Sequence, residues 1–99
     1  MSAMPQFSVV VPVFNERDNV KSLIDEIVAA LRGRHDFEIV YVDDNSRDDS
    51  LAVLQALKAQ VPELRVIHHV SQSGQSTAVR TGVKAARGAW IATLDGDGQ

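Results

Sequence analysis

Short apolar runs rich in β-branched residues alternate with amphipathic segments along the whole chain of 99 residues. The runs are Phe7–Val13, Phe37–Val42, Leu64–Val70 and Ala89–Leu94, and each has the length and composition of a strand in a buried parallel sheet. Four strands that alternate with three helices predict successive right-handed βαβ units. We therefore expect an α/β fold, an open parallel sheet with alternating helices in a single domain. Trp90 is expected to pack in its core.

The amphipathic segments carry the start and stop signals of helices. From Val20 to Leu31, apolar residues recur at the spacing of one helical face, and Leu51 to Leu57 continue the pattern in the second segment. Small residues from Ala78 to Ala86 give the third helix a face for close packing. Capping signals flank the first two helices: Asn15 with Asp18, Gly33, and Ser46 with Asp49.

Charge and composition exclude several classes of protein. The formal net charge is -3, whereas binding of nucleic acid needs a basic stripe, so nucleic acid is not an expected partner. No cysteine is present, which excludes disulfides, thiolate metal sites and a thiol nucleophile. The amino terminus lacks a signal-peptide pattern, and no apolar run is long enough to span a bilayer. We expect a cytoplasmic location, with any membrane association supplied by segments absent from this chain.

Polar residues follow three of the predicted strands. Ligands of open parallel sheets bind beyond the carboxyl ends of the strands, so we expect these residues to share one edge of the sheet. Two carboxylates one residue apart suit Mg²⁺ or Mn²⁺, which takes protein carboxylates together with phosphate oxygens, and the glycine between them allows close backbone approach. The three groups are Asn15-Glu16, Asp43-Asp44, and Asp95-Gly96-Asp97 with Gln99 as a further oxygen ligand.

Each of these groups also has a simpler structural interpretation. Asp95 to Asp97 has the composition of a polar turn. Asp43 and Asp44 either start the next helix or accept hydrogen bonds from a nucleobase. Pro12 is either a strand terminator or a rigid turn beside a nucleotide, and Glu16 either binds a ribose hydroxyl or is a helix first-turn acid.

Two further segments give weaker signals. The loop Ser71–Ser76 precedes a helix but lacks the glycine spacing of phosphate-binding and dinucleotide-binding loops, so an ordinary strand-to-helix loop is the better interpretation. His35, His68 and His69 lack zinc-ligand spacing, and surface or strand-end roles are expected for them.

Four stretches in the same order, FSVVVPVFNE, EIVYVDDNSRDDS, SGQSTAVRTGVKAARG and TLDGDGQ, resemble family 2 inverting glycosyltransferases of the GT-A fold. The similarity is greatest to the dolichyl- or undecaprenyl-phosphate glycosyltransferase group, in which Gln follows the metal motif as Gln99 does here. The resemblance implies that residues 1–99 are the Rossmann-like, nucleotide-sugar-binding N-terminal half of such a domain, truncated after the Asp-x-Asp motif.

The resemblance also implies roles for individual residues. Pro12, Phe14 and Glu16 would line the nucleotide pocket, although the family often has Tyr in place of Phe14. Asp43 and especially Asp44 would read the base and ribose. Asp95 and Asp97, with help from Gln99, would hold Mg²⁺ or Mn²⁺ on the donor diphosphate. Asp95 and Gly96 would also belong to the nucleotide-sugar site. Most polyprenyl-phosphate members have a bulkier residue in place of Gly96 or Gly98, which leaves the identity of the sugar open.

The implied reaction is a one-step displacement at the anomeric carbon of a nucleotide-diphosphate sugar. A polyprenyl phosphate is the implied acceptor. The catalytic base and acceptor site would lie in the missing half, so this fragment alone is expected to be inactive. The outer edge of the fourth strand, Trp90–Leu94, would lack a neighbour, and we expect self-association there.

Three other classes of protein fit the sequence less well. A phospho-receiver domain also places paired acids after an early strand, but its phosphorylated Asp should end the third strand, where Ser71 follows. A non-catalytic nucleotide-binding module is disfavoured by the intact Asp-x-Asp motif. A NAD-dependent dehydrogenase lacks support because the glycine fingerprint is missing.

Overall fold

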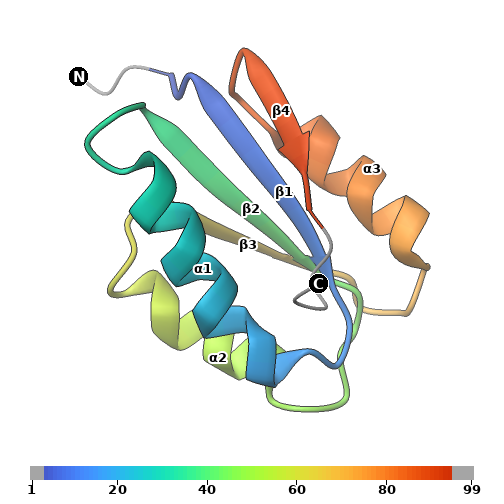
Figure 1. Cartoon of the computed structure of the whole chain (residues 1–99). Helices are drawn as coiled ribbons and strands as arrows, with labels where there is room; N and C mark the ends of the chain where they lie inside the picture. Colours follow the sequence, from blue (N-terminus) through green and yellow to red (C-terminus); the bar gives the residue numbers. More distant parts are fainter. Residues whose placement is uncertain (1–3, 95–99) are drawn as a thin grey trace.

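The computed structural model of the chain describes residues 4–94 (Figure 1). The strands and helices alternate, and the four strands form one parallel sheet in the order β3-β2-β1-β4. In chain order the elements are β1 (Phe7–Val13), α1 (Arg17–Leu31), β2 (Phe37–Asp43), α2 (Ser50–Lys58), β3 (Leu64–His68), α3 (Gln75–Ala85) and β4 (Trp90–Thr93). The expected α/β fold is confirmed.

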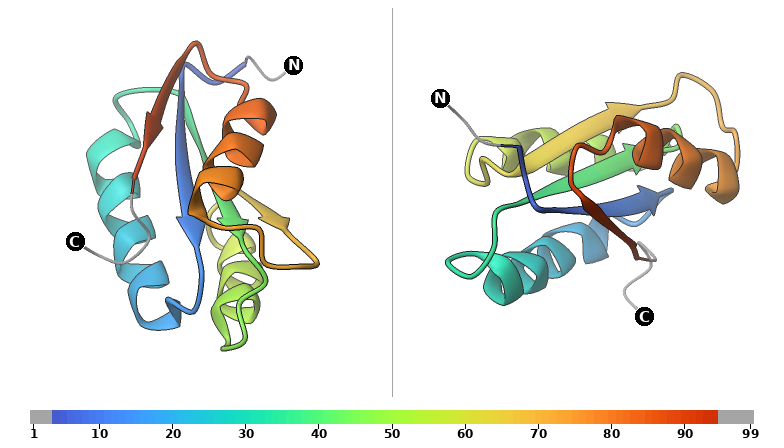
Figure 2. Two further views of the ribbon diagram at one scale, coloured as in Figure 1. Left: turned by 90° about the vertical axis from the view of Figure 1, so that its right-hand side faces the viewer. Right: turned by 90° about the horizontal axis from the view of Figure 1, so that it is seen from above.

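The sheet has a layer of helices on each face, which Figure 2 shows from two directions. Helices α1 and α2 pack together on one face, over a core that includes Val11, Ile39 and Tyr41. Helix α3 covers β1 and β2 on the other face, over a smaller core that includes Val10 and Val40. Because β1 and β2 are buried on both faces, they need the continuous apolar runs seen in the sequence.

Several predicted boundaries are confirmed and others were wrong. Gly33 follows the end of α1 with φ +84, as expected of a terminating glycine. Strand β3 ends at His68 and not at Val70, because Asp43 and His68 form the last pair of its ladder with β2. Val70 lies beyond that pair and is 88% exposed.

The predicted capping pairs do not cap the helices through their side chains. Helix α1 is preceded by Glu16 and α2 by Asp49, and neither residue makes a side-chain capping bond. The Ser46 hydroxyl is used elsewhere, since it accepts a hydrogen bond from the backbone N–H of Asn15 at 2.9 Å. Contacts between two loops, more than 30 residues apart, therefore take precedence over local capping.

Pro12 lies inside the central strand β1 without breaking a ladder. In this part of β1, the backbone N–H and C=O groups of even-numbered residues point toward β4, as the hydrogen bond from Leu94 N to Val10 O (3.0 Å) shows. The last β1–β4 register pair is Val10 with Thr93, so the missing N–H of Pro12 falls beyond that ladder. On its other side β1 remains paired with β2 up to Val13.

The expectation that Trp90 packs in the core was wrong. Its side chain is 66% exposed, and every residue of β4 is exposed. Strand β4 is an edge strand that pairs only with β1 within the described residues, whereas α3 packs on β1 and β2. The local sequence of β4 is that of a buried strand, but its place at the sheet edge decides its exposure.

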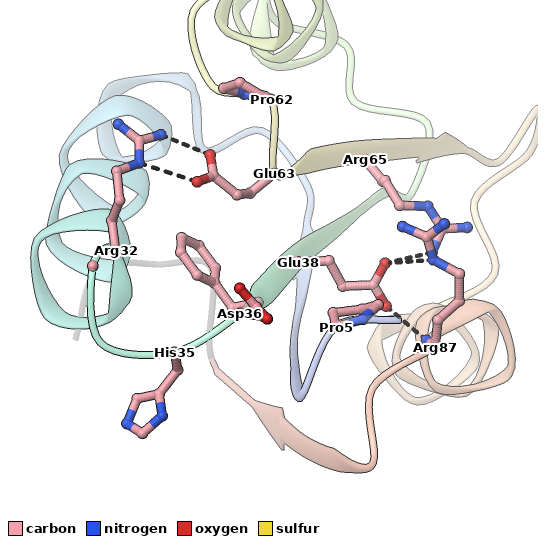
Figure 3. Close-up of a pocket in the computed structure, with 11 residues that line it drawn as sticks. Pro5, Arg32, His35, Asp36, Glu38, Pro62, Glu63, Arg65 and Arg87 are labelled. Atoms are coloured by element: carbon pink, nitrogen blue, oxygen red, sulfur yellow. Dashed lines mark hydrogen bonds and ion pairs between the residues drawn. The ribbon is translucent and has the colours of Figure 1, made fainter. Parts of the chain in front are cut away.

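At the amino ends of the strands, the buried carboxylate of Glu38 accepts hydrogen bonds from four donor groups, and Figure 3 shows those of Arg65 and Arg87. It accepts hydrogen bonds from the Ser8 hydroxyl (2.6 Å) and from the backbone N–H of Arg87 (2.6 Å). The guanidinium groups of Arg65 and Arg87 lie 2.8 and 3.1 Å from its Oε1. Glu38 therefore ties β1, β2 and β3 to the segment that leads into β4.

None of the three helices in residues 4–94 combines the length and apolar character needed to cross a membrane.

Candidate functional site

The carboxyl ends of β1 and β2 meet at one edge of the sheet. Val13 and Asp43, the last residues of these two strands, are register partners, and the chain continues from each into a polar loop. The loop after β1 carries Asn15 and Glu16, and the residue after β2 is Asp44. We call this edge, with its loops at residues 14–16, 44–49 and 69–74, the rim. The predicted convergence of the first two groups is confirmed.

The loops that follow β1 and β2 are locked together by Asn15. Its side-chain oxygen accepts hydrogen bonds from the backbone N–H groups of Arg47 (2.7 Å) and Asp48 (3.3 Å). Its φ of 54° lies in the left-handed region, which Asn tolerates better than most residues. The backbone N–H of Glu16 donates to the Ser50 hydroxyl at 2.9 Å. The two loops therefore form one fixed surface.

Asp44 is buried and connects β2 to the loop before α3. Its Oδ1 accepts hydrogen bonds from Ser73 N (2.8 Å) and His69 Nδ1 (2.9 Å), and its Oδ2 accepts one from Gly74 N (2.8 Å). Burial alone would raise the pKa of Asp44, but these donors outweigh it and lower the pKa. A carboxylate with this environment remains ionised at neutral pH.

Asp43 is fully buried and is held by two donors on one oxygen. Its Oδ2 accepts hydrogen bonds from Ser46 N (3.2 Å) and lies 3.0 Å from His68 Nδ1. Its Oδ1 is buried and has no hydrogen-bond partner in the structure. Buried carboxylate oxygens normally accept a hydrogen bond, so this atom is an unsatisfied acceptor at the rim.

The other predicted residues divide into two groups. Pro12 is buried near the end of β1, and Phe14 and Glu16 are half-buried in the loop after it. The Glu16 carboxylate accepts a hydrogen bond from the side chain of Asn19 at 2.9 Å. Asp95, Gly96, Asp97 and Gln99, which include the predicted metal ligands, lie outside the described residues. Within residues 4–94, no cluster of three or more carboxylate or imidazole groups is arranged to hold a metal ion.

Sequence reasoning missed the pairing between two aspartates and two histidines. Asp43 contacts His68 and Asp44 contacts His69, so two consecutive acids at the end of β2 match two consecutive histidines at the end of β3. The strand-end position of the histidines was predicted, but their partners follow only from the β2–β3 register. A doublet of acids and a doublet of bases ending neighbouring parallel strands is a signal that could have indicated this pairing.

Comparison with known proteins identifies the family. The model for glycosyl transferase family 2 matches residues 8–99, nearly the whole chain. The chain belongs to glycosyl transferase family 2. The resemblance to this family seen in the four sequence stretches is thereby confirmed, and the enzyme class of the family is that of the glycosyltransferases.

Two relatives are named for a lipid phosphate. The chain is 36% identical to a dolichol-phosphate mannosyltransferase of Mycosarcoma maydis, over 97% of this chain and 34% of that protein. It is 41% identical to an undecaprenyl-phosphate 4-deoxy-4-formamido-L-arabinose transferase of Pseudomonas fluorescens, over 91% of this chain and 27% of that protein. The chain spans about a third of the length of the curated relatives it matches.

Solved structures of glycosyltransferases share this fold. The mannosyltransferase PcManGT from Pyrobaculum calidifontis, in complex with GDP-Man and Mn²⁺, superposes with a TM-score of 0.85 at 24% identity, covering 97% of this chain and 28% of that one. S. aureus TarS in complex with UDP-GlcNAc gives a TM-score of 0.83 at 27% identity, covering 93% of this chain and 26% of that one. The GT-A type of α/β fold expected from the sequence is confirmed.

The strand order separates this family 2 chain from the phospho-receiver alternative. Receiver domains have the order 2-1-3-4-5, in which the first strand lies between the second and the third. Here β1 lies between β2 and β4, and β3 is on the outer side of β2. The receiver hypothesis was therefore wrong.

Proposed function

We propose that the protein carrying this chain transfers a sugar from a nucleotide-diphosphate sugar to a polyprenyl phosphate, with inversion, and that the rim binds the donor. Family membership supports the reaction class, and the names of the relatives support the lipid-phosphate acceptor. The complexes of PcManGT with GDP-Man and of TarS with UDP-GlcNAc support a nucleotide sugar as donor.

The observation that carries the proposal is that the buried carboxylates of Asp43 and Asp44 at the rim can each accept a further hydrogen bond. Asp43 Oδ1 has no partner, and Asp44 Oδ2 accepts one hydrogen bond although a carboxylate oxygen can accept two. Nucleobases and riboses offer N–H and O–H donors. Neighbouring loops already hold both carboxylates in place, so their own ordering adds little to the cost of binding. Because Asp43 is 0% and Asp44 3% exposed, the proposal requires a rim loop to move aside when the nucleotide binds.

The proposed roles follow the position of each residue. Asp43 and Asp44 accept hydrogen bonds from the base and ribose, whereas Pro12, Phe14 and Glu16 form the wall of the pocket along the loop after β1. Phe14 contributes stacking without a hydroxyl.

A divalent cation completes the proposed donor site. Asp95 and Asp97, with Gln99, have the hard oxygen donors that Mg²⁺ or Mn²⁺ prefers, and Gly96 leaves room for the diphosphate. Leu94, the residue before them, is hydrogen-bonded to β1 at the rim end of β4. When bound, the cation would supply charge neutralisation for the departing diphosphate. The residue that activates the acceptor is proposed to lie outside this chain, so that the fragment alone is inactive.

Calorimetric titration of GDP and UDP with and without Mn²⁺, on the longest protein that carries this chain, tests the donor site. We expect metal-dependent binding that Asp44→Asn weakens by about tenfold or more, since hydrogen bonds to charged groups are worth roughly 1.5–3 kcal/mol. Asp97→Ala should remove the metal dependence. The control is Asp25→Asn, on the exposed surface of α1, which should bind as the wild type does.

Two results would contradict the donor-site proposal. The first is equal affinity in the wild type and in Asp44→Asn, provided that both proteins are folded. The second is metal-dependent binding that Asp97→Ala leaves intact. Nucleotide binding without sugar transfer to a polyprenyl phosphate would instead favour the non-catalytic nucleotide-binding module.

We further propose that the chain associates with a second copy of itself through β4. Trp90, Ile91 and Leu94 are 66, 44 and 39% exposed. Trp90 and Leu94 donate their backbone N–H groups to β1, so the backbone groups of Ile91 and Thr93 point away from β1 and can pair with another strand. Sedimentation of the 99-residue chain should show concentration-dependent dimers. Ile91→Lys should abolish them, whereas Val83→Lys, on the exposed side of α3, should not. A wild type that remains monomeric at all concentrations would refute the proposal.

A further inference from the structure

His69 joins three elements of the rim. It is the first residue after β3, and its backbone N–H donates a hydrogen bond to Asp43 O at 2.9 Å, just beyond the last β2–β3 register pair. Its ring nitrogens contact Asp44 Oδ1 (Nδ1, 2.9 Å) and the Thr81 hydroxyl of α3 (Nε2, 3.0 Å). The side chain is only 16% exposed. One imidazole therefore links the carboxylate after β2 to the helix that follows the next loop.

The chemistry of these contacts fixes how the ring is used. An ionised carboxylate only accepts hydrogen bonds, so Nδ1 of His69 must carry a proton and donate it to Asp44. In the neutral ring Nε2 then accepts from the Thr81 hydroxyl. Both ring nitrogens are satisfied in this tautomer, which restrains rotation of the imidazole and leaves it no lone pair for a ligand.

Asp44 passes this restraint to the loop before α3. The carboxylate accepts hydrogen bonds from the backbone N–H groups of Ser73 and Gly74, each at 2.8 Å. Gly74 has φ +96 and ψ 159, a conformation that only glycine adopts readily, so the loop depends on external contacts for its shape. Asp44 Oδ1 accepts two of these hydrogen bonds and Oδ2 accepts one, so Oδ2 can accept one more from a ligand.

We propose that His69 is a positioning residue of the nucleotide-sugar site, which orients the Asp44 carboxylate and the Ser73–Gly74 loop for binding of the nucleoside diphosphate. This inference rests on the proposed function of the rim. His69 donates from Nδ1 to Asp44 and does not itself contact the nucleotide. The Thr81 hydroxyl holds the required tautomer.

His68 does not have the same arrangement, although it contacts Asp43 at a similar distance. Its side chain is 36% exposed, and within the described residues its ring is bonded to Asp43 alone, at 3.0 Å. His69 in contrast is bound at both ring nitrogens and reaches a second element. The positioning role is therefore assigned to His69.

Two conservative substitutions separate the two ends of the ring. The amide nitrogen of Asn occupies about the place of Nδ1, so His69→Asn retains a donor to Asp44 and loses the contact with Thr81. The amide of the longer Gln reaches about the place of Nε2, so His69→Gln retains the contact with Thr81 and loses the donor to Asp44. His35→Gln is the matched control, because His35 is exposed at the other end of the sheet, where its side chain contacts Gln6 and the ring of Phe7 and no residue of the rim.

The first readout needs no ligand. Hydrogen exchange of the Ser73 and Gly74 amides, followed by NMR, should be roughly tenfold faster in His69→Gln and close to the wild-type rate in His69→Asn and His35→Gln. In the wild type, the imidazole spectrum of His69 should show the proton on Nδ1. Unchanged exchange in His69→Gln, or a proton on Nε2 alone, would overturn the inference.

The second readout is the affinity for GDP and UDP with Mn²⁺, measured in the longest protein that carries the chain. We expect about tenfold weaker binding in His69→Gln and less than threefold change in His69→Asn. A merely structural role predicts instead that both variants lose affinity in proportion to their loss of melting temperature, which would also overturn the inference. A wild type that binds neither nucleotide refutes the proposed function itself, a failure distinct from wild-type binding that is insensitive to His69→Gln.

Discussion

Replacement of Glu38 by Gln is the sharpest test of how the sheet is held at its amino ends. The carboxylate is 2% exposed and accepts hydrogen bonds from the Ser8 hydroxyl, the Arg87 backbone and two guanidinium groups. Its Ser8 partner in turn accepts a hydrogen bond from Gly88 N at 2.8 Å. Loss of the charge leaves the cations of Arg65 and Arg87 without a counter-charge close to the buried end of β2.

The pKa of Glu38 gives the magnitude. Burial alone would raise it, but the donors from Ser8, Arg87 and Arg65 outweigh burial and lower the pKa from 4.5 to about 2. A shift of this size corresponds to about 3 kcal/mol of folding stability at neutral pH. Because the pKa is lower in the folded than in the unfolded state, this stability is present above pH 4.5 and is lost as the pH falls towards 2.

Urea unfolding of the wild type and Glu38→Gln across pH 7 to 2.5 measures this contribution. We expect a difference in the free energy of unfolding of about 3 kcal/mol at pH 7, which shrinks as the pH falls below 4.5 because only the wild type titrates at this position. Asp25→Asn is the control, since the exposed pair of Asp25 with Lys21 should contribute less than about 0.5 kcal/mol. A difference that stays constant between pH 7 and 3 would refute the reasoning.

Two further predictions concern the two cores of the sheet. Tyr41→Phe should leave stability unchanged or raise it by up to about 1 kcal/mol in thermal unfolding, because the buried hydroxyl has no hydrogen-bond partner; a loss above about 1 kcal/mol would contradict this. Gly82→Ala should destabilise the chain by about 1–3 kcal/mol, although Ala favours helices, because the new Cβ would overlap Val10 Cγ1 and lie 3.2 Å from Val42 Cγ2. Equal or higher stability in that variant would show that α3 shifts freely on the sheet.

Much of the fold and part of the site were predictable from local patterns. The run Phe7–Val13 coincides with β1, because a strand buried on both faces needs continuous β-branched residues. The convergence of Asn15 and Glu16 with Asp43 and Asp44 at one edge followed from the parallel topology alone. These features depend on residues close in sequence or on rules that hold for every parallel sheet.

Contacts between distant residues were not predictable in this way. The sequence places Ser46 in a capping pattern, yet its hydroxyl binds Asn15 of another loop. The residues next to Trp90 in the sequence are typical of a buried strand, yet its side chain is exposed. The reason is that the strand order places β4 at the edge of the sheet.

The amino-acid sequence by itself therefore determined the alternation of strands and helices, the shared edge of the sheet and the family. The tertiary structure decided that the strand order is β3-β2-β1-β4, and that His69 contacts Asp44 and Thr81. The physical reason is that register and layer packing join residues 12 to 80 positions apart, whose interactions leave no periodic trace in the chain.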